Sequence, residues 1–198
     1  MTDNYTKIIS DNLDKLSKNL SSDLTETLPG TREGDSFTFN AFGETCIIRP
    51  DQIILGKDMQ TGPVGIILSL CALHAKLDTC ILNPLKAFKD FPNSMPYAGA
   101  FTTHTEHILI PYVEKIEKKQ EQIIQKLGGH EASEAGDFSF IVYPLPKIAL
   151  CYIFYAADDE FPASVTCLYS NNASAFLPID ALADVGEYTS RKIEELVN

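Results

Sequence analysis

Two histidines near the middle of the chain have the spacing of paired metal ligands. His104 and His107 lie three residues apart, with Glu106 between them. Residues three apart on a helix share a face, so two imidazoles there could bind one metal ion. A metal-dependent enzyme would need a third ligand, for which Glu160 is the best candidate. The alternative is that both histidines are surface residues near the start of a helix.

Cys71 and His74 have the same spacing, within the most apolar region of the chain. A thiolate paired with an imidazole is a nucleophile when the pair lines a pocket. Burial opposes that chemistry, because it raises the pKa of a thiol. The favoured interpretation is a core cysteine beside a hydrogen-bonded core histidine, with nucleophilic catalysis as the alternative.

An acidic triplet, Asp158, Asp159 and Glu160, joins two predicted strands, and Phe161 and Pro162 follow it. Acidic residues in turns usually accept hydrogen bonds from backbone N–H groups and remain solvated. Three carboxylates on a turn could instead bind Ca²⁺ or Mg²⁺, although the spacing of an EF-hand is absent. A third interpretation is that Phe161 packs beside Pro162 and fixes the strands. The triplet and Phe161 are therefore candidate binding residues.

An aromatic segment contributes the other candidate binding residues. Phe88, Phe91, Tyr97 and Phe101 lie close together in the sequence, where prolines interrupt short helical fragments. Such side chains can line a ligand pocket or form a docking face for a partner. We therefore add Tyr97 and Phe101 to the candidate binding residues. The sequence has no G-x-G-x-x-G, Walker A, G-x-S-x-G or H-E-x-x-H motif, which removes the common catalytic classes.

The overall charge excludes two classes of partner. The chain has 198 residues and a formal net charge of −11, from 27 acidic and 16 basic residues. Such a surface repels phosphate backbones and anionic lipids, so we expect binding neither to nucleic acid nor to membranes. The length and the 44% hydrophobic content suit a single domain over residues 1–198, with residues 1–30 as an N-terminal helix and loop.

The cysteines and the apolar stretches indicate a cytoplasmic protein. Five cysteines, an odd number without a Cys-x-x-Cys pair, favour free thiols in a reducing compartment. Residues 1–20 are polar and lack the apolar core of a signal peptide. The most apolar stretch, residues 64–73, is far shorter than the ~20 residues needed to cross a bilayer.

The first part of the chain predicts a helix followed by a hairpin. Apolar residues at three- and four-residue steps indicate an amphipathic helix that ends at Ser21–Ser22. Two alternating runs, residues 37–40 and 45–48, flank Gly43 and predict a β-hairpin. Residues 53–55 favour a third short strand.

Three further helices follow from the apolar pattern. A helix from Pro63 to Leu77, with Thr61 as its cap, is apolar on nearly every side and belongs in the centre of the fold. Residues 108–127 predict an amphipathic helix that ends at Gly128. A final amphipathic helix opens at Pro178.

The strand-like runs near the C-terminus complete the predicted fold. Residues 138–143, 148–155 and 164–169 are rich in β-branched and aromatic side chains and predict an antiparallel meander. Its central strand should be buried on both faces. The N-terminal hairpin and this meander, packed around the central apolar helix, define an α+β fold with an antiparallel sheet.

Several short motifs occur in an order that is shared with a known family. They are Gly62 to Leu77, Phe88-Lys-Asp-Phe-Pro92, Tyr97, Phe101, Leu127-Gly-Gly129, Gly136-Asp137, Leu145-Pro146, Asp158-Asp-Glu-Phe-Pro162 and Ala173 to Leu182. Over roughly residues 36–190 the chain resembles domain-of-unknown-function family 3786, which is found mostly in anaerobic bacteria and archaea. In some members the domain is joined to an iron–sulfur-binding module of the type found in corrinoid iron–sulfur proteins.

The resemblance implies a function but no catalytic residues. The cluster-binding cysteines of the fused forms belong to the other module, so an iron–sulfur role here would require a partner, an iron–sulfur or corrinoid protein. Ile81-Leu-Asn-Pro84 stands where members often carry a Trp-containing stretch, so a pocket there would differ. We expect a non-catalytic ligand-binding or accessory protein, with a corrinoid or other tetrapyrrole as a candidate ligand. The alternatives are the metal-dependent enzyme and a structural or homo-oligomerising protein.

Overall fold

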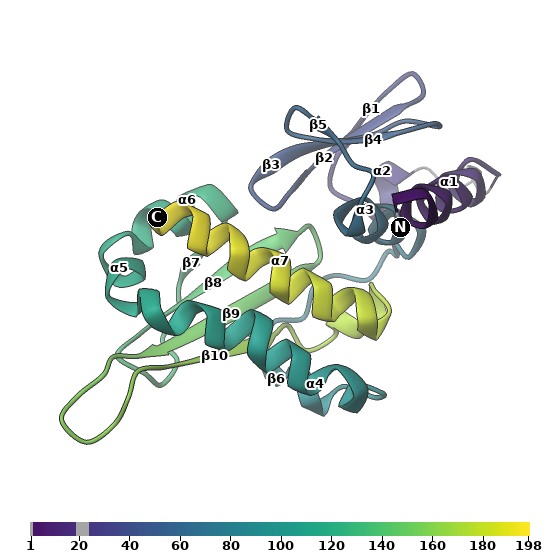
Figure 1. Cartoon of the computed structure of the whole chain (residues 1–198). Coiled ribbons are helices and arrows are strands. Elements are labelled where there is room, and N and C mark those ends of the chain that lie inside the picture. Colours follow the sequence, from purple (N-terminus) through teal and green to yellow (C-terminus); the bar gives the residue numbers. More distant parts are fainter. Residues whose placement is uncertain (1, 19–23) are drawn as a thin grey trace.

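The computed structural model describes residues 2–18 and 24–198 of the chain. These residues form two five-stranded antiparallel sheets together with helices, so the predicted α+β class is confirmed. In Figure 1 one sheet lies at the upper right beside α1 (Thr2–Lys18), and the other lies behind the long C-terminal helix α7 (Ile179–Val197). The helix end predicted at Ser21–Ser22 lies outside the described residues.

The first sheet, sheet A, is a meander in which each strand pairs with its neighbour in the sequence. Its strands are β1 (Thr31–Glu33), β2 (Ser36–Ala41), β3 (Glu44–Ile48), β4 (Ile53–Leu55) and β5 (Asp58–Met59). Buried and less buried residues alternate along β2 and β3, because only one face of the sheet packs on the core. The predicted hairpin and the third strand are confirmed, with Phe39 opposite Cys46.

The second sheet, sheet B, contains the predicted C-terminal meander. Its strands, in spatial order, are β6 (Lys86–Ala87), β10 (Ser164–Tyr169), β9 (Ile148–Tyr155), β8 (Phe138–Leu145) and β7 (His130–Glu131). Every residue of β9 from Ile148 to Phe154 is buried. Helices cover one face of the sheet, and Cys80, Leu82 and Leu85 pack on the other. The predicted burial of the central strand on both faces is therefore confirmed.

The hairpin and the meander lie in separate sheets, and the tip of the hairpin joins them. Phe42 and Gly43 both have positive φ, +51° and +74°, as in a two-residue type I′ turn. The Phe42 N–H donates to the Pro144 carbonyl of sheet B at 2.6 Å. The Phe42 ring is fully buried and meets the Tyr188 ring edge-on, with 4.6 Å between the ring centroids. Phe42 thus anchors sheet A to sheet B and α7.

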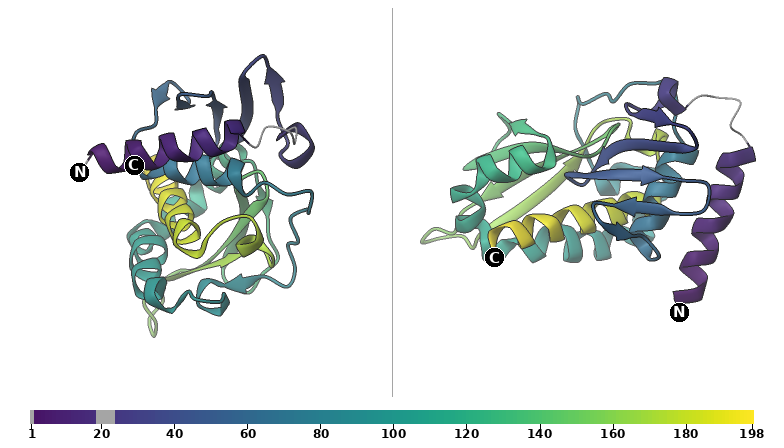
Figure 2. Two further views of the ribbon diagram at one scale, coloured as in Figure 1. Left: turned by 90° about the vertical axis from the view of Figure 1, so that its right-hand side faces the viewer. Right: turned by 90° about the horizontal axis from the view of Figure 1, so that it is seen from above.

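Helices fill the space between the sheets and cover one face of sheet B. Besides α1 and α7 they are α2 (Leu24–Thr27), α3 (Pro63–Leu73), η1 (Phe88–Asp90), α4 (Met95–Phe101), the π-helix η2 (Thr102–Glu106), the 3₁₀ segment η3 (His107–Tyr112), α5 (Val113–Lys118), α6 (Gln120–Leu127) and η4 (Ala173–Ala175). Figure 2 shows α1 lying along α3 beside sheet A.

The central helix α3 is shorter than its sequence predicts. It ends at Leu73, and Leu77, the predicted last residue, is 74% exposed. The chain turns away at His74 because the residues beyond it no longer face packing partners and are mostly exposed. Gly62, and not the predicted Thr61, is the N-cap residue. The helix packs between α1 and α7 as its apolar character requires, and the one interior polar residue, Ser69, accepts a hydrogen bond from Asn12 at 2.9 Å.

The helix predicted over residues 108–127 is divided into three pieces. Pro111 has no N–H to donate within a regular helix, and it lies inside η3, a 3₁₀ segment. A second interruption at Lys119 separates α5 from α6. Gly128 then ends α6 in the left-handed conformation, with φ of +70°, as predicted.

Helix α7 is fixed to sheet B by two buried tyrosines. The Tyr169 hydroxyl donates to the Leu182 carbonyl at 2.6 Å, and the Tyr152 hydroxyl lies 2.9 Å from the Ser190 hydroxyl. The predicted final helix is therefore confirmed, beginning directly after Pro178.

Two further predictions concern the state of the cysteines and the absence of a membrane-spanning helix. All five cysteines lie in the described ranges and are free thiols, as predicted. None of the described helices is long and apolar enough to span a bilayer.

Candidate functional site

The segment that carries the predicted metal ligands turns its carboxylate inward and its imidazoles outward. His104 and His107 are exposed, whereas Glu106 is partly buried. The helix phase changes between them, because η2 is a π-helix and η3 is a 3₁₀ segment. Among the described residues, no three His, Cys, Asp or Glu side chains form a group that could hold a metal ion. The structure therefore does not join His104 and His107 to the expected third ligand, Glu160.

Glu106 caps the edge of sheet B. Its Oε1 accepts a hydrogen bond from the Cys167 N–H at 3.0 Å. The short strand β6 pairs with β10 at Leu168 and Tyr169, so Cys167 lies just beyond the paired part of that edge. The carboxylate of Glu106 thus takes the place of a carbonyl from a neighbouring strand. Single π-helical turns inside helices occur frequently at functional sites.

A hollow opens where this capped edge meets α4 and η2, and we call it the edge hollow. Its volume is about 290 Å³, near the lower limit for small-molecule pockets. Its apolar lining consists of Ala87, Phe88, Ala98 and Phe101. Its polar lining consists of Lys89, Thr102, Glu106 and Thr166. The hollow therefore combines an apolar surface with a carboxylate, an ammonium group and two hydroxyls.

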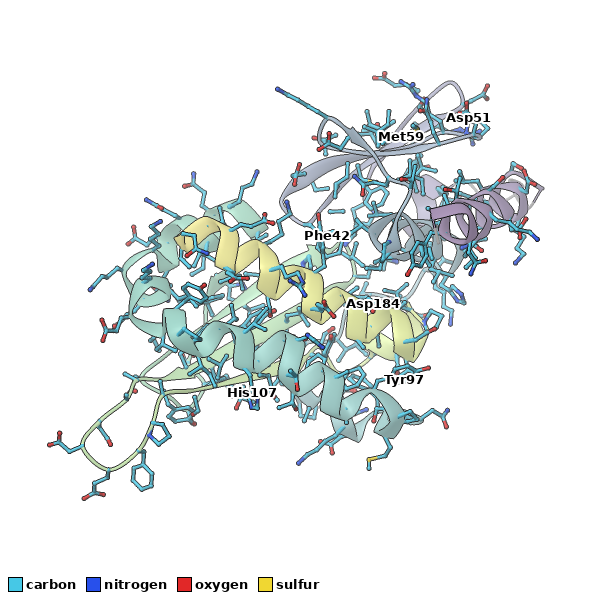
Figure 3. The ribbon with its side chains drawn as sticks, in the orientation of Figure 1. Phe42, Asp51, Met59, Tyr97, His107 and Asp184 are labelled. Carbon is cyan, nitrogen blue, oxygen red and sulfur yellow. The ribbon has the colours of Figure 1, made fainter. Side chains whose placement is uncertain are left out.

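Two stacked phenyl rings line the edge hollow. The rings of Phe88 and Phe101 are nearly parallel, at 11°, with centroids 4.4 Å apart, and both side chains are almost completely buried. Phe91 lies in the core instead, edge-on to Tyr169 at 5.8 Å. Tyr97 is 37% exposed and lies on α4 outside the lining (Figure 3). Of the predicted aromatic residues, Phe88 and Phe101 are thus brought together in a hollow.

In the predicted acidic turn, the Asp158 carboxylate binds backbone N–H groups of its own turn. Asp158 Oδ1 accepts hydrogen bonds from the N–H groups of Glu160 at 2.8 Å and Phe161 at 2.7 Å, and these bonds lower the pKa of Asp158. The expected role of an acidic residue in a turn is confirmed for Asp158. Phe161 is 66% exposed, so most of its ring faces solvent, and packing beside Pro162 stays a prediction. The loop extends away from the helices in Figure 1, and its residues, Asp159 included, do not line the edge hollow.

Cys71 and His74 do not form a nucleophilic pair. Cys71 is buried, and burial raises the pKa of its thiol to about 12, so the thiol is protonated at neutral pH. His74 is exposed at the C-cap of α3, so the prediction of a core histidine is wrong. His74 is the C-cap residue of α3 and its side chain is exposed, whereas Cys71 one turn earlier is buried in the core.

Sequence reasoning missed the polar residues of the edge hollow. Ala98, Thr102 and Glu106 recur every four residues, the spacing of one helix face, and this signal could have identified them. Glu106 was visible between the two histidines, but it was not itself assigned to a site. No local signal pointed to Lys89 or Thr166, which reach the hollow from elements distant in the sequence.

The edge hollow offers no axial ligand to a haem, one of the tetrapyrroles that the family resemblance leaves open. Haem iron is held by axial ligands such as His, Cys, Met or Tyr. None of the described residues that line the edge hollow is of those types. A ligand of this hollow is therefore held by its hydrogen bonds, its charge and its apolar surface.

Comparison with known proteins identifies a family without a described activity. The family model described as Domain of unknown function (DUF3786) matches residues 21–192, which include all of the edge hollow. No curated protein and no solved structure matches the chain.

Proposed function

We propose that this chain, which belongs to the family described as Domain of unknown function (DUF3786), is a non-catalytic ligand-binding protein whose ligand occupies the edge hollow. The observation that carries the proposal is the partly buried carboxylate of Glu106 beside the stacked rings of Phe88 and Phe101. A carboxylate has two oxygens with several acceptor positions. Glu106 can therefore bind a ligand N–H while it keeps its hydrogen bond to the Cys167 amide.

The lining favours a small, partly apolar molecule with a hydrogen-bond donor. Ala87, Ala98 and the edges of the buried Phe88 and Phe101 rings supply the apolar lining, and Glu106 supplies an acceptor. Thr102 and Thr166 add hydroxyls that can donate or accept. In the described lining the ionisable side chains are Lys89 and Glu106, and Glu106 accepts its hydrogen bond from a backbone N–H and not from a nucleophilic hydroxyl or thiol. These features support binding more than catalysis.

An accessory role beside an iron–sulfur or corrinoid protein is the finer part of the proposal, and the family resemblance alone supports it. In such a role the metal centre would belong to the partner, since the edge hollow offers no axial ligand. The chain would then contribute a small-molecule site to the shared system.

Indole and benzofuran test the proposal, because they have nearly the same shape and only indole carries an N–H donor. Each is titrated into ¹⁵N-labelled protein, and amide shifts are followed by NMR. We expect indole to shift the amides of Thr166 and Cys167 and to bind about tenfold more tightly than benzofuran, as one hydrogen bond to a charged group predicts. Hydroxocobalamin, added separately, should be lost on desalting.

Two variants give the matched control. Glu106→Ala should abolish the preference for indole, whereas Glu114→Ala, an exposed acid on α5, should leave it unchanged. Equal affinities for indole and benzofuran, or amide shifts confined to surfaces away from the edge hollow, would contradict the proposal.

A further inference from the structure

A second hollow lies where α3 meets α7, and we call it the α3–α7 groove. Its volume is about 310 Å³, which suits a small molecule. Its main lining comes from the start of α3 and the middle of α7: Pro63, Val64, Ile67, Asp184, Glu187 and Tyr188. Figure 3 shows Asp184 on α7 near the place where α3 approaches it. These residues are entirely different from those of the edge hollow.

The wall of the groove is apolar and rigid. Ile67 is 1% exposed, and Val64 packs against the same core. The Tyr188 ring is held edge-on by the anchored ring of Phe42, at 80° between the ring planes. Lys192 Nζ already lies 5.5 Å from the centroid of the Tyr188 ring. Tyr188 therefore serves the groove as an apolar wall, without a cation–π role of its own.

The rim of the groove carries a carboxylate without a cationic partner. Glu187 is paired with Arg191, whose Nη2 lies 2.8 Å from Glu187 Oε1 and whose Nε donates to the same oxygen at 3.1 Å. Within the described residues, Asp184 has no ion pair. Asp180 lies one turn before it on α7, so the local charge is negative.

We propose that the α3–α7 groove binds a small organic cation. Its ammonium group lies against the Asp184 carboxylate, and its apolar part lies on Val64, Ile67 and Tyr188. Charge complementarity selects a cation, because Asp184 and Glu187 outnumber the paired Arg191 in the lining and repel an anion. The apolar wall selects an organic ammonium over a hydrated metal ion, which would leave that surface in water.

The charge on Asp184 also makes the site sensitive to pH. The apolar wall removes part of its solvation, and the carboxylates of Glu187 and Asp180 oppose a third negative charge nearby, so its pKa rises to about 6. The groups that face Asp184 are Glu187, Asp180, Tyr188 and Arg191 on α7, while α3 presents Pro63, Val64 and Ile67, which do not titrate. Cation binding should therefore weaken as the pH falls through about 6.

The probes for this site are 2-phenylethylammonium and its neutral analogue 2-phenylethanol. At pH 7.5 we expect the cation to shift amides of residues 64–67 and 184–188 in ¹⁵N NMR spectra. The cation should bind about fivefold more tightly than the alcohol, which is the gain in affinity expected from one partly exposed ion pair. Added salt should reduce this preference, and so should a change to pH 5.

The variants separate this site from the edge hollow. Asp184→Asn, which keeps the side-chain shape, should bring the cation down to the affinity of the alcohol. Asp180→Asn, on the same helix but outside the lining, should change binding less than about twofold. Glu106→Ala should leave the cation unaffected, so this result stands or falls independently of the edge hollow. Thermal unfolding of each variant shows whether it remains folded.

Three outcomes would overturn the proposal. The first is equal affinity for the cation and the alcohol in the unmodified protein. The second is an unchanged preference for the cation in folded Asp184→Asn. The third is a pattern of amide shifts that leaves out residues 64–67 and 184–188.

Discussion

Sheet B is covered on both faces, whereas sheet A packs on α1 and α3 with one face and leaves the other toward solvent. The strands of sheet B include two of eight residues, and those of sheet A have at most six. Two buried tyrosine hydroxyls bond sheet B to α7, while the anchored ring of Phe42 ties sheet A to the same helix. Burial on both faces thus makes sheet B the more deeply packed sheet, and Phe42 is the buried ring that ties sheet A to sheet B and α7.

Truncation of Phe42 should break the connection between the sheets. Phe42→Ala removes a fully buried ring, and such changes cost about 3–5 kcal/mol of unfolding free energy. Urea unfolding followed by circular dichroism measures the loss. Phe161→Ala, at an exposed ring, should cost less than about 0.5 kcal/mol. Similar losses for the two variants would show that Phe42 is not the anchor.

A matched pair of isoleucines compares the outer faces of the two sheets. Ile153 in β9 is 7% exposed and lies in the cluster covered by Cys80, Leu82 and Leu85, while Ile54 in β4 is only partly buried. Ile153→Ala should therefore cost about 2–4 kcal/mol, and Ile54→Ala about 1 kcal/mol or less. Both losses of unfolding free energy are obtained from the denaturant midpoints, provided that the free energy of each variant depends on denaturant concentration with the same slope. A larger loss at Ile54 would reverse the comparison.

The smallest expected effect concerns Asp184, on the helix that both sheets share. Its pKa is raised to about 6 in the folded chain, above the ordinary carboxyl value of 3.8. The folded state therefore binds the proton more tightly than the unfolded state, and stability from this group falls as the pH rises from about 4 to 6. Asp184→Asn should raise stability at pH 7 by less than about 0.5 kcal/mol, because solvent reaches the side chain and screens its charge.

Thermal unfolding at several pH values checks this prediction. The gain from Asp184→Asn should shrink as the pH is lowered from 7 to 4, where the native carboxyl is already neutral. A gain that stays constant over this range would mean that the carboxylate does not cause it.

The local elements of the fold could be predicted because their signals are local. The alternation along residues 36–41 and the apolar run of residues 148–154 identified the hairpin and the doubly buried strand. The division into two sheets could not be predicted, since it depends on where Phe42 inserts, a contact with the distant Tyr188 and Pro144.

The candidate sites were predicted only in part. A regular helix would place His104 and His107 on one face. In the structure both imidazoles are exposed and the described residues provide no third ligand, while Glu106 between them points inward to the Cys167 N–H. Phe88 and Phe101 were identified as binding candidates because of their type, whereas Asp184 looked like an ordinary charge on the polar side of an amphipathic helix.

The bond from the Phe42 amide to the Pro144 carbonyl gives the molecule a built-in reporter for hydrogen exchange. Amides within β2 and β3 exchange when sheet A itself opens, but the Phe42 amide is protected by an acceptor in sheet B. If the hairpin tip lifts while both sheets remain intact, deuterium enters at Phe42 before it enters at Phe39. The ratio of these two exchange rates therefore measures how often the sheets part without unfolding.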